Sequence, residues 1–281
     1  MKKSYIKYIV GGCLAISGVI LAAIGLAMGG FDVIRNGVSF SWTEGFVYDN
    51  EDVLIEISPS EQEIENLRID VSTAEITVSY ADVEKVVIEA EGVRKNLLKA
   101  QVNPTTKTLD ITYQINTFIV FGGPSADITV TLPKGMKFNN ADLHLGVGDA
   151  QIKDITASSL TIDSDVGDTI LSGGSADVVK VDSGVGEIIF NNFKSKTFGA
   201  DTGVGTLQYD GEIDSNISLS TGVGSITMNI KGNAAEYSYA VDKGVGEVTL
   251  NGSPLSTMTN ASATKLFTIN SGVGAVNINI R

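Results

Sequence analysis

The sequence predicts an all-β protein: a single-domain β-solenoid of about 19-residue Gly-Val-Gly repeats, preceded by one amino-terminal transmembrane helix. A tripeptide that recurs along the chain, apolar and polar residues that alternate around it, and an uncharged apolar run near the start support this fold. The plan of the chain is a basic cytoplasmic tail over residues 1–7, a transmembrane helix over 8–30, a juxtamembrane linker or cap over 31–60, and an extracytoplasmic repeat domain over 61–281.

The repeat is the strongest signal. Its central valines are Val147, Val166, Val185, Val204, Val223, Val245 and Val273. The first five are evenly spaced, the last two follow at wider intervals, and each valine is preceded by glycine or aspartate and followed by glycine. One such unit cannot bury its apolar face alone, so successive units must stack as the coils of a solenoid.

Each repeat is expected to form strand, tight turn and strand. Apolar residues stand four and usually six positions before the valine, and three and five positions after it, as with Ile188 and Phe190 after Val185. This alternation is typical of strands with one buried face. The flanking glycines supply backbone angles that other residues adopt only at a cost, and we expect the valine between them to point inward.

A degenerate copy of the repeat lies earlier in the chain, over residues 67–78, with Thr73 at the valine position. The interval from Thr73 to Val147 is close to four units long and holds strand-like runs at 86–88, 109–113 and 128–132. We therefore interpret residues 61–281 as one continuous domain. Residues 95–107 fit either a short helix or an extended hairpin.

The first thirty residues predict a membrane anchor. No charge interrupts the chain from Tyr8 to Phe31, which is long enough for a helix across a bilayer. Lys2, Lys3 and Lys7 precede it, so the amino terminus is expected in the cytoplasm and the carboxy-terminal domain outside. A cleaved signal peptide, with Ala27-Met28-Gly29 as its site, is the alternative.

Two features near the anchor leave alternatives open. Cys13, the only cysteine, is interpreted as an apolar residue of the helix rather than a lipidation site, because the apolar stretch follows it. Four aromatic residues follow the anchor: Phe40, Trp42, Phe46 and Tyr48. They are expected either at the membrane interface or folded over the first coil as a cap.

The chain is acidic, with a net charge of −13. Without the three early lysines, 17 basic and 33 acidic residues remain, a balance of −16. Such a surface argues against nucleic acid and anionic membrane faces as partners. It suits a cationic partner, or serves only to keep the domain soluble.

The pattern offers few candidates for chemistry. We call the position of the central valine, or of Thr73 in the degenerate copy, the ladder position. A row of acids or amides is expected three residues before it: Asp70, Asp163, Asp182, Asp201, Asp242 and Asn270. These carboxylates either accept hydrogen bonds from their own turns or, as the alternative, bind calcium. His144, the only histidine, lies on the polar side of a strand, and no nucleophile or phosphate-binding loop accompanies it. We predict no catalytic, cofactor-binding or metal-binding residues.

The lysine-rich start, the apolar span ending in Met-Gly-Gly, the segment from Ile69 to Ala74 and the repeated Ser/Thr-Gly-Val-Gly units together form a recognisable pattern. It resembles a Gram-positive bacterial family of β-strand repeats known as "putative adhesins", related to toast-rack β-repeat domains. The resemblance implies an extracytoplasmic solenoid without known catalysis. Some members of that family act in cell-envelope stress responses, including those to cationic antimicrobial peptides.

These observations predict a non-enzymatic, membrane-anchored protein of the cell envelope that serves as an adhesin or binding scaffold. The alternative is an extracytoplasmic sensor or regulator of envelope stress that binds cationic antimicrobial peptides, and a minor one is a polysaccharide-active solenoid enzyme. The expected partners are the membrane and a cell-surface protein or cationic peptide. We also expect residues 276–281 to end the solenoid as an open edge that accepts a further strand.

Overall fold

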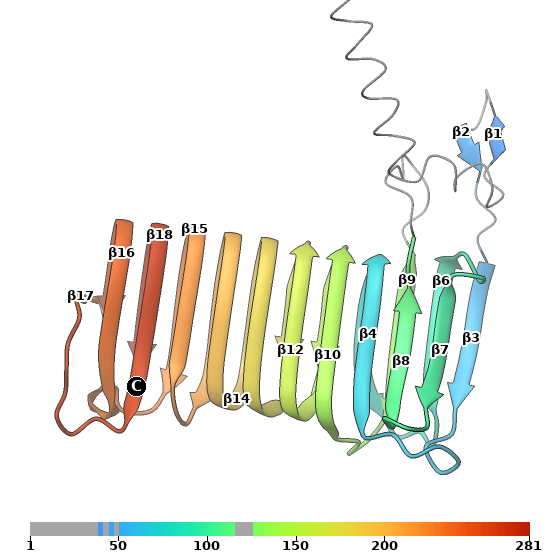
Figure 1. Ribbon diagram of the computed structural model, residues 1–281, viewed down its shortest axis with the longest axis horizontal. Helices are drawn as coiled ribbons and strands as arrows, with labels where there is room; N and C mark the ends of the chain where they lie inside the picture. The colour runs from blue at the N-terminus through green and yellow to red at the C-terminus, as the bar shows by residue number, and fades with distance from the viewer. Residues whose placement is uncertain (1–38, 42–44, 48–50, 116–125) are drawn as a thin grey trace, which may run out of the picture. The chain divides into compact units, whose positions relative to one another are not determined.

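The structure is a computed structural model that describes residues 39–41, 45–47, 51–115 and 126–281 (Figure 1). The chain divides into two units, and the described part of the first is a small antiparallel pair, β1 (Ser39–Ser41) and β2 (Gly45–Val47). The predicted helix over 8–30 lies outside the described residues, as do the side chains of the aromatic residues after it. Within the described ranges, no helix is long and apolar enough to cross a bilayer.

The second unit, Glu51–Gln114 with Ser125–Arg281, is a β-solenoid. Before the regular repeats its strands are β3 (Glu51–Ile57), β4 (Asn66–Thr73), β5 (Glu75–Ala81), β6 (Val86–Val93), β7 (Leu98–Asn103), β8 (Thr108–Tyr113) and β9 (Asp127–Pro133). Then follow β10 (Phe138–Val147), β11 (Ala150–Lys153), β12 (Thr156–Val166), β13 (Thr169–Ser172), β14 (Ser175–Ile213), β15 (Ile217–Lys231), β16 (Tyr237–Leu250), β17 (Ser253–Pro254) and β18 (Lys265–Ile280). One short 3-10 turn, η2 (Ala234–Glu236), interrupts this all-β fold.

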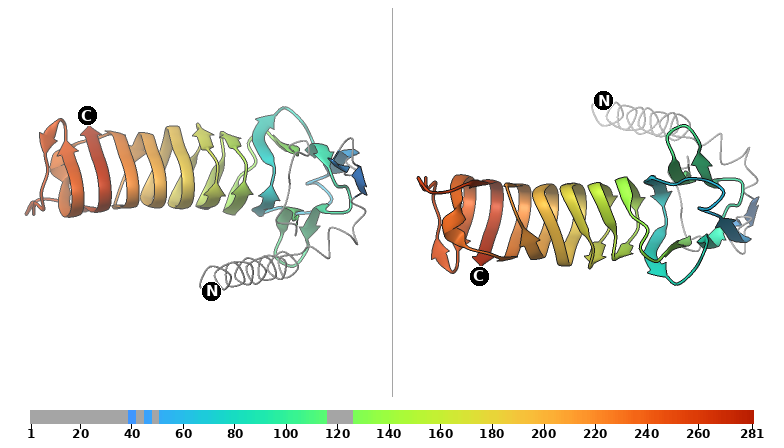
Figure 2. Two further views of the ribbon diagram at one scale, coloured as in Figure 1. Left: turned by 90° about the horizontal axis from the view of Figure 1, so that it is seen from above. Right: turned by 90° about the horizontal axis from the view of Figure 1, so that it is seen from below.

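The middle of the solenoid follows the predicted repeat. β10 pairs with β12, and β12 with β14, in parallel and always one repeat apart, so that Val147 lies beside Val166 and Val166 beside Val185. The long strand β14 runs through two corners, at Val185 and Val204, and its second half pairs with β15 at the same offset. Figure 2 shows these coils stacked along one axis.

At the amino-terminal end the coils are not stacked in chain order. The β4–β5 coil pairs directly with β10 and β11, which places Thr73 beside Val147 and confirms the degenerate copy and its register. β8 and β9 come later in the sequence, yet they stack outside β4 and β5. The interval from Thr73 to Val147 is therefore not a series of four stacked units. β6, β8 and β9 include the expected strand-like runs, and residues 95–107 hold β7 of an antiparallel hairpin with β8.

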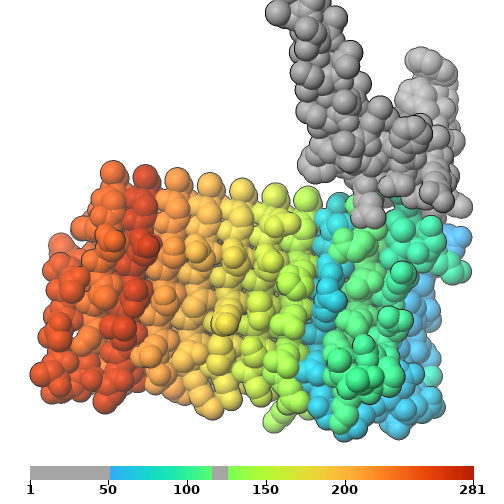
Figure 3. Space-filling view, in the orientation of Figure 1, coloured from blue at the N-terminus to red at the C-terminus, as the bar shows by residue number. Residues whose placement is uncertain are grey.

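The carboxy-terminal end shows the same kind of rearrangement. β18, the last strand of the sequence, lies between β15 and β16 and pairs in parallel with both. Figure 3 shows this band of chain, dark red, between two orange ones. The prediction of an open edge at residues 276–281 was wrong, because both sides of β18 are already paired. The outermost coil is β16 instead.

The chain itself covers part of the outer side of β16. Residues 251–264 cross over this end, where Tyr239 and Met258 exchange two backbone hydrogen bonds of 2.8 Å and the Leu255 N–H donates to the Val248 carbonyl at 2.8 Å. β17 adds a short antiparallel pairing. At the opposite end the edge strands β3 and β7 run antiparallel to their neighbours. Both ends thus depart from the repeat where a sheet edge would otherwise be free to aggregate.

The core is a column of stacked apolar rows. Aromatic residues fill it at two levels, one where Phe190, Phe193, Phe198 and Tyr209 meet with centroids 4.8–5.6 Å apart, and one where Tyr237, Tyr239 and Phe267 join β16 to β18. The tyrosine hydroxyls still find partners: Tyr209 donates to the carbonyls of Phe193 and Glu212, and Tyr237 to that of Ile213.

Candidate functional site at the turn edge

The Gly-Val-Gly corners stack along one side of the solenoid, which we call the turn edge. The prediction that the ladder valines point inward was wrong: all seven are between 46% and 73% exposed. The glycine after each valine has a φ of +141° to +154°, a conformation that turns the chain and interrupts the strand alternation. In every coil except that of Val245, the residue two positions before the valine is buried, and the valine itself faces solvent.

The corner glycines are required for stacking as well as for turning. A Cβ on Gly205 would lie 1.9 Å from the Gly186 carbonyl oxygen, and one on Gly224 would lie 1.8 Å from that of Gly205. Any side chain at these positions therefore collides with the backbone of the neighbouring coil. The result is a corner on which valine is the only projecting side chain of the tripeptide in most coils.

The valines form a continuous apolar ridge, which we call the valine row. In spatial order it consists of Val147, Val166, Val185, Val204, Val223, Val273 and Val245. Adjacent coils of a sheet are about 4.8 Å apart, so seven positions extend over roughly 30 Å. An exposed apolar strip of this length is unusual on a soluble domain, and it is a feature of surfaces that bind partners.

A row of carboxylates lies beside the valine row, where the sequence placed it. Asp163 and Asp182 are paired in register, and His144 lies between Asp70 and Asp163, with 3.4 Å between His144 Nδ1 and Asp163 Oδ2. His144 thus separates two acids of the row. At the other end, Ser220 and Asn270 replace acids in the row, so that part of it carries less negative charge.

Neither use suggested for these acids is seen. Asp70 contacts Arg68 and Gln114, and, among the described residues, no acid of this row accepts a hydrogen bond from a backbone N–H of its own turn. The expectation that these carboxylates accept hydrogen bonds from their own turns was wrong. Across the described parts of the chain, no three histidine, cysteine or acidic side chains are grouped so that they could hold a metal ion.

A second acidic row, on the other side of the valine row, was missed. In the first three coils of the valine row it consists of Asp149, Asp168 and Glu187, two positions after each valine, whereas the next coils carry Thr206, Ser225 and Ala275 there. Here the acids do satisfy backbone groups, but of the next coil: Asp149 Oδ1 accepts from the Asp168 N–H and Asp168 Oδ1 from the Glu187 N–H, both at 2.9 Å. The recurrence of an acid directly after the ladder tripeptide in three successive repeats was the available signal.

Acids of the first row lie close to the ridge at its Val147 end. A hollow of about 230 Å³ lies there, and Asp70, Asp163 and Asp165 line it together with His144 and Val147. Carboxylates beside an exposed apolar strip suit a partner that carries ammonium or guanidinium groups next to apolar side chains.

Comparison with known proteins decides the family. A sequence model described as Toastrack DUF4097 matches residues 64–281, which is well over half of the chain. The chain belongs to this family. The resemblance drawn from the sequence is thereby confirmed, and the Toastrack match begins just before β4, the first strand that stacks on the regular repeats.

Solved structures resemble this Toastrack chain at low identity. A "putative adhesin" from Bacteroides fragilis is 18% identical, with a TM-score of 0.48 over 86% of this chain and 100% of that one. A "putative cell adhesion protein" from Clostridium sporogenes is 17% identical, with a TM-score of 0.40 over 83% and 100%. A "putative lipid binding protein" from Parabacteroides distasonis is 14% identical, with a TM-score of 0.29 over 82% and 96%. The comparison with curated proteins finds no match.

Proposed function

We propose that the protein is a non-enzymatic binding scaffold of the cell surface, and that the turn edge is its binding face. The observation that carries the proposal is the valine row, a straight apolar ridge with carboxylates on both sides at Val166 and Val185. The uncharged segment over 8–30 would hold the scaffold in the membrane, with the solenoid outside. This is the functional class of the adhesins named above, but the proposal rests on the ridge.

The ridge fits binding better than stability alone. All seven valines are exposed rather than packed in the core, and Thr73, which pairs with Val147, is a polar residue at the equivalent position of another coil. The valine row therefore contributes little to the buried core, and its apolar surface is available to a partner. Burial of such surface by a partner contributes about 25 cal/mol per Å² removed from water.

The test displays the full chain on a non-adherent bacterium and counts the cells retained under flow on surfaces coated with epithelial cells or bacterial envelopes. The test variant carries Val166→Thr, Val185→Thr and Val204→Thr. A matched control carries the same kind of change on the flat faces, at the partly exposed residues Ile170, Val178 and Ile189. We expect retention to fall at least tenfold in the ridge variant only. Equal retention of both variants would contradict the proposal.

A second function, sensing cationic peptides, is favoured by the acidic rows and the hollow at Val147. Calorimetry of the full chain with a cationic amphipathic helix peptide tests it at low and moderate salt. We expect binding that weakens with salt, since partly exposed charges are screened, and that weakens further with Asp163→Asn, Asp165→Asn and Asp168→Asn. Replacement of Asp110 and Asp210, which lie off the turn edge, should change it little. Salt-insensitive binding, or none, would leave the acids a role in solubility alone.

A further inference from the structure

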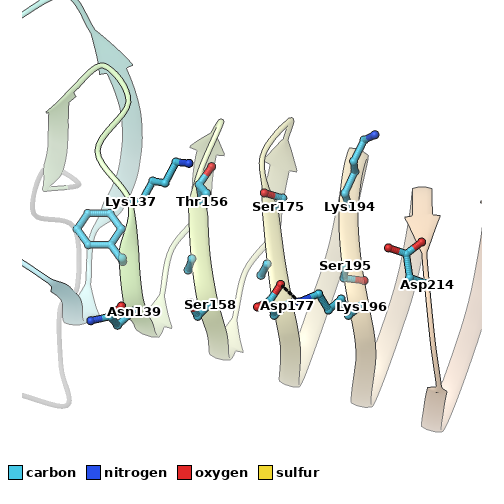
Figure 4. Close-up of a pocket in the computed structure, with 13 residues that line it drawn as sticks. Lys137, Asn139, Thr156, Ser158, Ser175, Asp177, Lys194, Ser195, Lys196 and Asp214 are labelled. Carbon is cyan, nitrogen blue, oxygen red and sulfur yellow. Dashed lines mark ion pairs between the residues drawn. The ribbon is translucent and has the colours of Figure 1, made fainter.

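A groove on a different part of the solenoid carries a different chemistry. It lies where the chain returns from one coil to the next and has a volume of about 440 Å³, within the range of ligand-binding pockets. Its residues come from three successive positions of the repeat, ten, nine and eight before the ladder valine. Figure 4 shows that they belong to neighbouring coils, with Lys137, Thr156, Ser175 and Lys194 along one line and Asn139, Ser158, Asp177 and Lys196 along another.

The groove is hollow because its floor is made of small side chains. The inward-facing position nine before the valine holds Phe138 in one coil and Ser195 three coils later, but alanine in the two coils between them, Ala157 and Ala176. Above these alanines the outward-facing residues are also short: Thr156, Ser158 and Ser175. A depression two coils wide therefore separates the larger residues at its ends.

Lysines stand at both ends of the groove, but at one end the carboxylates of Asp177 and Asp214, which also line the groove, offset their charge. Lys194 lies 3.0 Å from Glu212, whose pKa this contact lowers, and Lys196 lies 2.9 Å from Asp177. At the opposite end, within the described parts of the chain, Lys137 has no carboxylate within ion-pair distance. Lys137 and Lys194 occupy the same repeat position three coils apart, about 14 Å at roughly 4.8 Å per coil.

Between the lysines the groove offers hydroxyl groups without partners. The side-chain oxygens of Thr156, Ser158 and Ser175 make no hydrogen bond to the described residues, and all three line the groove. Each hydroxyl can both donate and accept. Because they repeat at the spacing of the coils, they present a regular series of polar groups, and a pyranose unit in an extended polysaccharide has a similar repeat.

These features distinguish among ligand classes. An apolar or helical peptide finds no exposed apolar floor, and an extended strand finds no free sheet edge, because the coils here are paired on both sides. Nucleic acid finds no exposed aromatic side chain on which its bases could stack, since Phe138, the aromatic residue that lines the groove, is buried. A chain of hydroxylated rings that carries a carboxylate fits both the row of hydroxyl groups and Lys137.

We infer that this groove binds an acidic oligosaccharide, with a carboxylate at Lys137 and its hydroxyls on Thr156, Ser158 and Ser175. The inference goes beyond the proposed function, because it uses neither the valine row nor the acidic rows. A surface protein with two separate binding faces would join a polysaccharide on one to a partner on the other.

Calorimetry of the full chain tests it with two probes that differ only in charge, a hexamer of galacturonic acid and its methyl ester. We expect the acid to bind about tenfold or more tightly than the ester, because charge-assisted hydrogen bonds are stronger than neutral ones. Lys137→Gln should remove most of that difference. Equal affinity for both probes, or no binding of the acid at millimolar concentration, would overturn the inference.

Two further variants keep the result interpretable. Ser158→Trp fills the groove and should abolish binding, whereas Ser218→Trp places the same side chain on an exposed strand position outside the groove. Loss of binding in both would contradict a local site. The ridge variant Val166→Thr, Val185→Thr, Val204→Thr should bind the acid like the wild type, so failure of the proposed function and failure of this inference remain distinguishable.

Discussion

The middle of the solenoid and its two ends solve the stacking problem differently. Between β10 and β15 each coil lies on the one that precedes it in sequence, always at an offset of one repeat. At the ends this order fails: β4 and β5 lie inside β8 and β9, and β18 lies inside β16. In the middle, neighbouring coils are therefore also neighbours in the sequence. At each end, the outermost coil instead pairs with a strand that does not precede it directly in the sequence.

The largest effect should come from removal of β18. Deletion of residues 265–281 takes away the only long pairing partner of β16 in the described chain, and it leaves Tyr237 and Tyr239 without Phe267. We expect amide hydrogens of β16 to exchange like those of an unfolded segment while those of β10–β14 stay protected. Protection of β16 in the truncated chain would show that it does not depend on β18.

The matched comparison deletes one coil from the middle. Removal of residues 167–185 joins Val166 to Gly186 at equivalent repeat positions, so the remaining coils can stack at the same register. Because stability in a repeat protein is approximately a sum over neighbouring units, we expect a folded protein with a melting temperature lower by a few degrees. Global unfolding of this variant would refute the idea that the stability of the middle is a sum of contributions from neighbouring coils.

A smaller effect separates the two tasks of glycine. Gly205 and Gly252 both have positive φ, but a Cβ on Gly205 meets the carbonyl oxygen of Gly186, whereas a Cβ on Gly252, in the crossover at the end, has nothing within 4 Å. Gly252→Ala should cost about 1 kcal/mol from backbone strain alone. Gly205→Ala should cost about 3 kcal/mol or more, since the coils must also move apart. Denaturant titration of both variants measures the difference, and equal costs would mean that close stacking is unimportant.

The sequence predicted what depends on local periodicity. The register of the regular repeats, the inward rows such as Ile188 and Phe190, and the degenerate copy at Thr73 all follow from alternation and spacing. The outward orientation of the valines could not be predicted in this way. A glycine with positive φ turns the chain at each corner, so the alternation of inward and outward side chains does not continue through it. The position of β18 could not be predicted either, because β16 and β18 have the same repeat pattern and that pattern does not distinguish the outermost coil.

The candidate site was predictable only in part. The acids at Asp163 and Asp182 were identified, but their role was not, because hydrogen bonding depends on which way the corner projects the side chain. The acids at Asp149 and Asp168 bind N–H groups of the next coil, a contact that only the stacking of consecutive repeats creates. The groove with Ala157 and Ala176 arises in the same way, from short side chains in neighbouring coils.

The smallest effect concerns alkaline pH and again compares the middle with the end. Burial raises the pKa of Tyr237 and of Tyr239 from 10.0 to about 12, and it also raises the pKa of Tyr209. Because the folded state favours the neutral phenol, Tyr237 and Tyr239 contribute fully to the stability of the fold below pH 10. That contribution is lost as pH rises from 10 to about 12. We expect the β16 end to lose its near-ultraviolet circular dichroism in this window while tyrosinate absorbance rises. Tyr237→Phe should reduce the pH dependence; an unchanged alkaline transition would assign it to other groups.

The buried position of the last strand has a consequence for how the molecule is made. Arg281, the final residue, is held by two hydrogen bonds, from its N–H to the Ile230 carbonyl and from the Gly232 N–H to its own carbonyl. During synthesis the β16 segment leaves the ribosome before β18, so its coil waits for a neighbour that has not yet been translated. The middle coils can stack in the order in which they are synthesised, whereas the coil of β16 gains its long pairing only after β18 has been made. The two regions therefore differ in when they can fold.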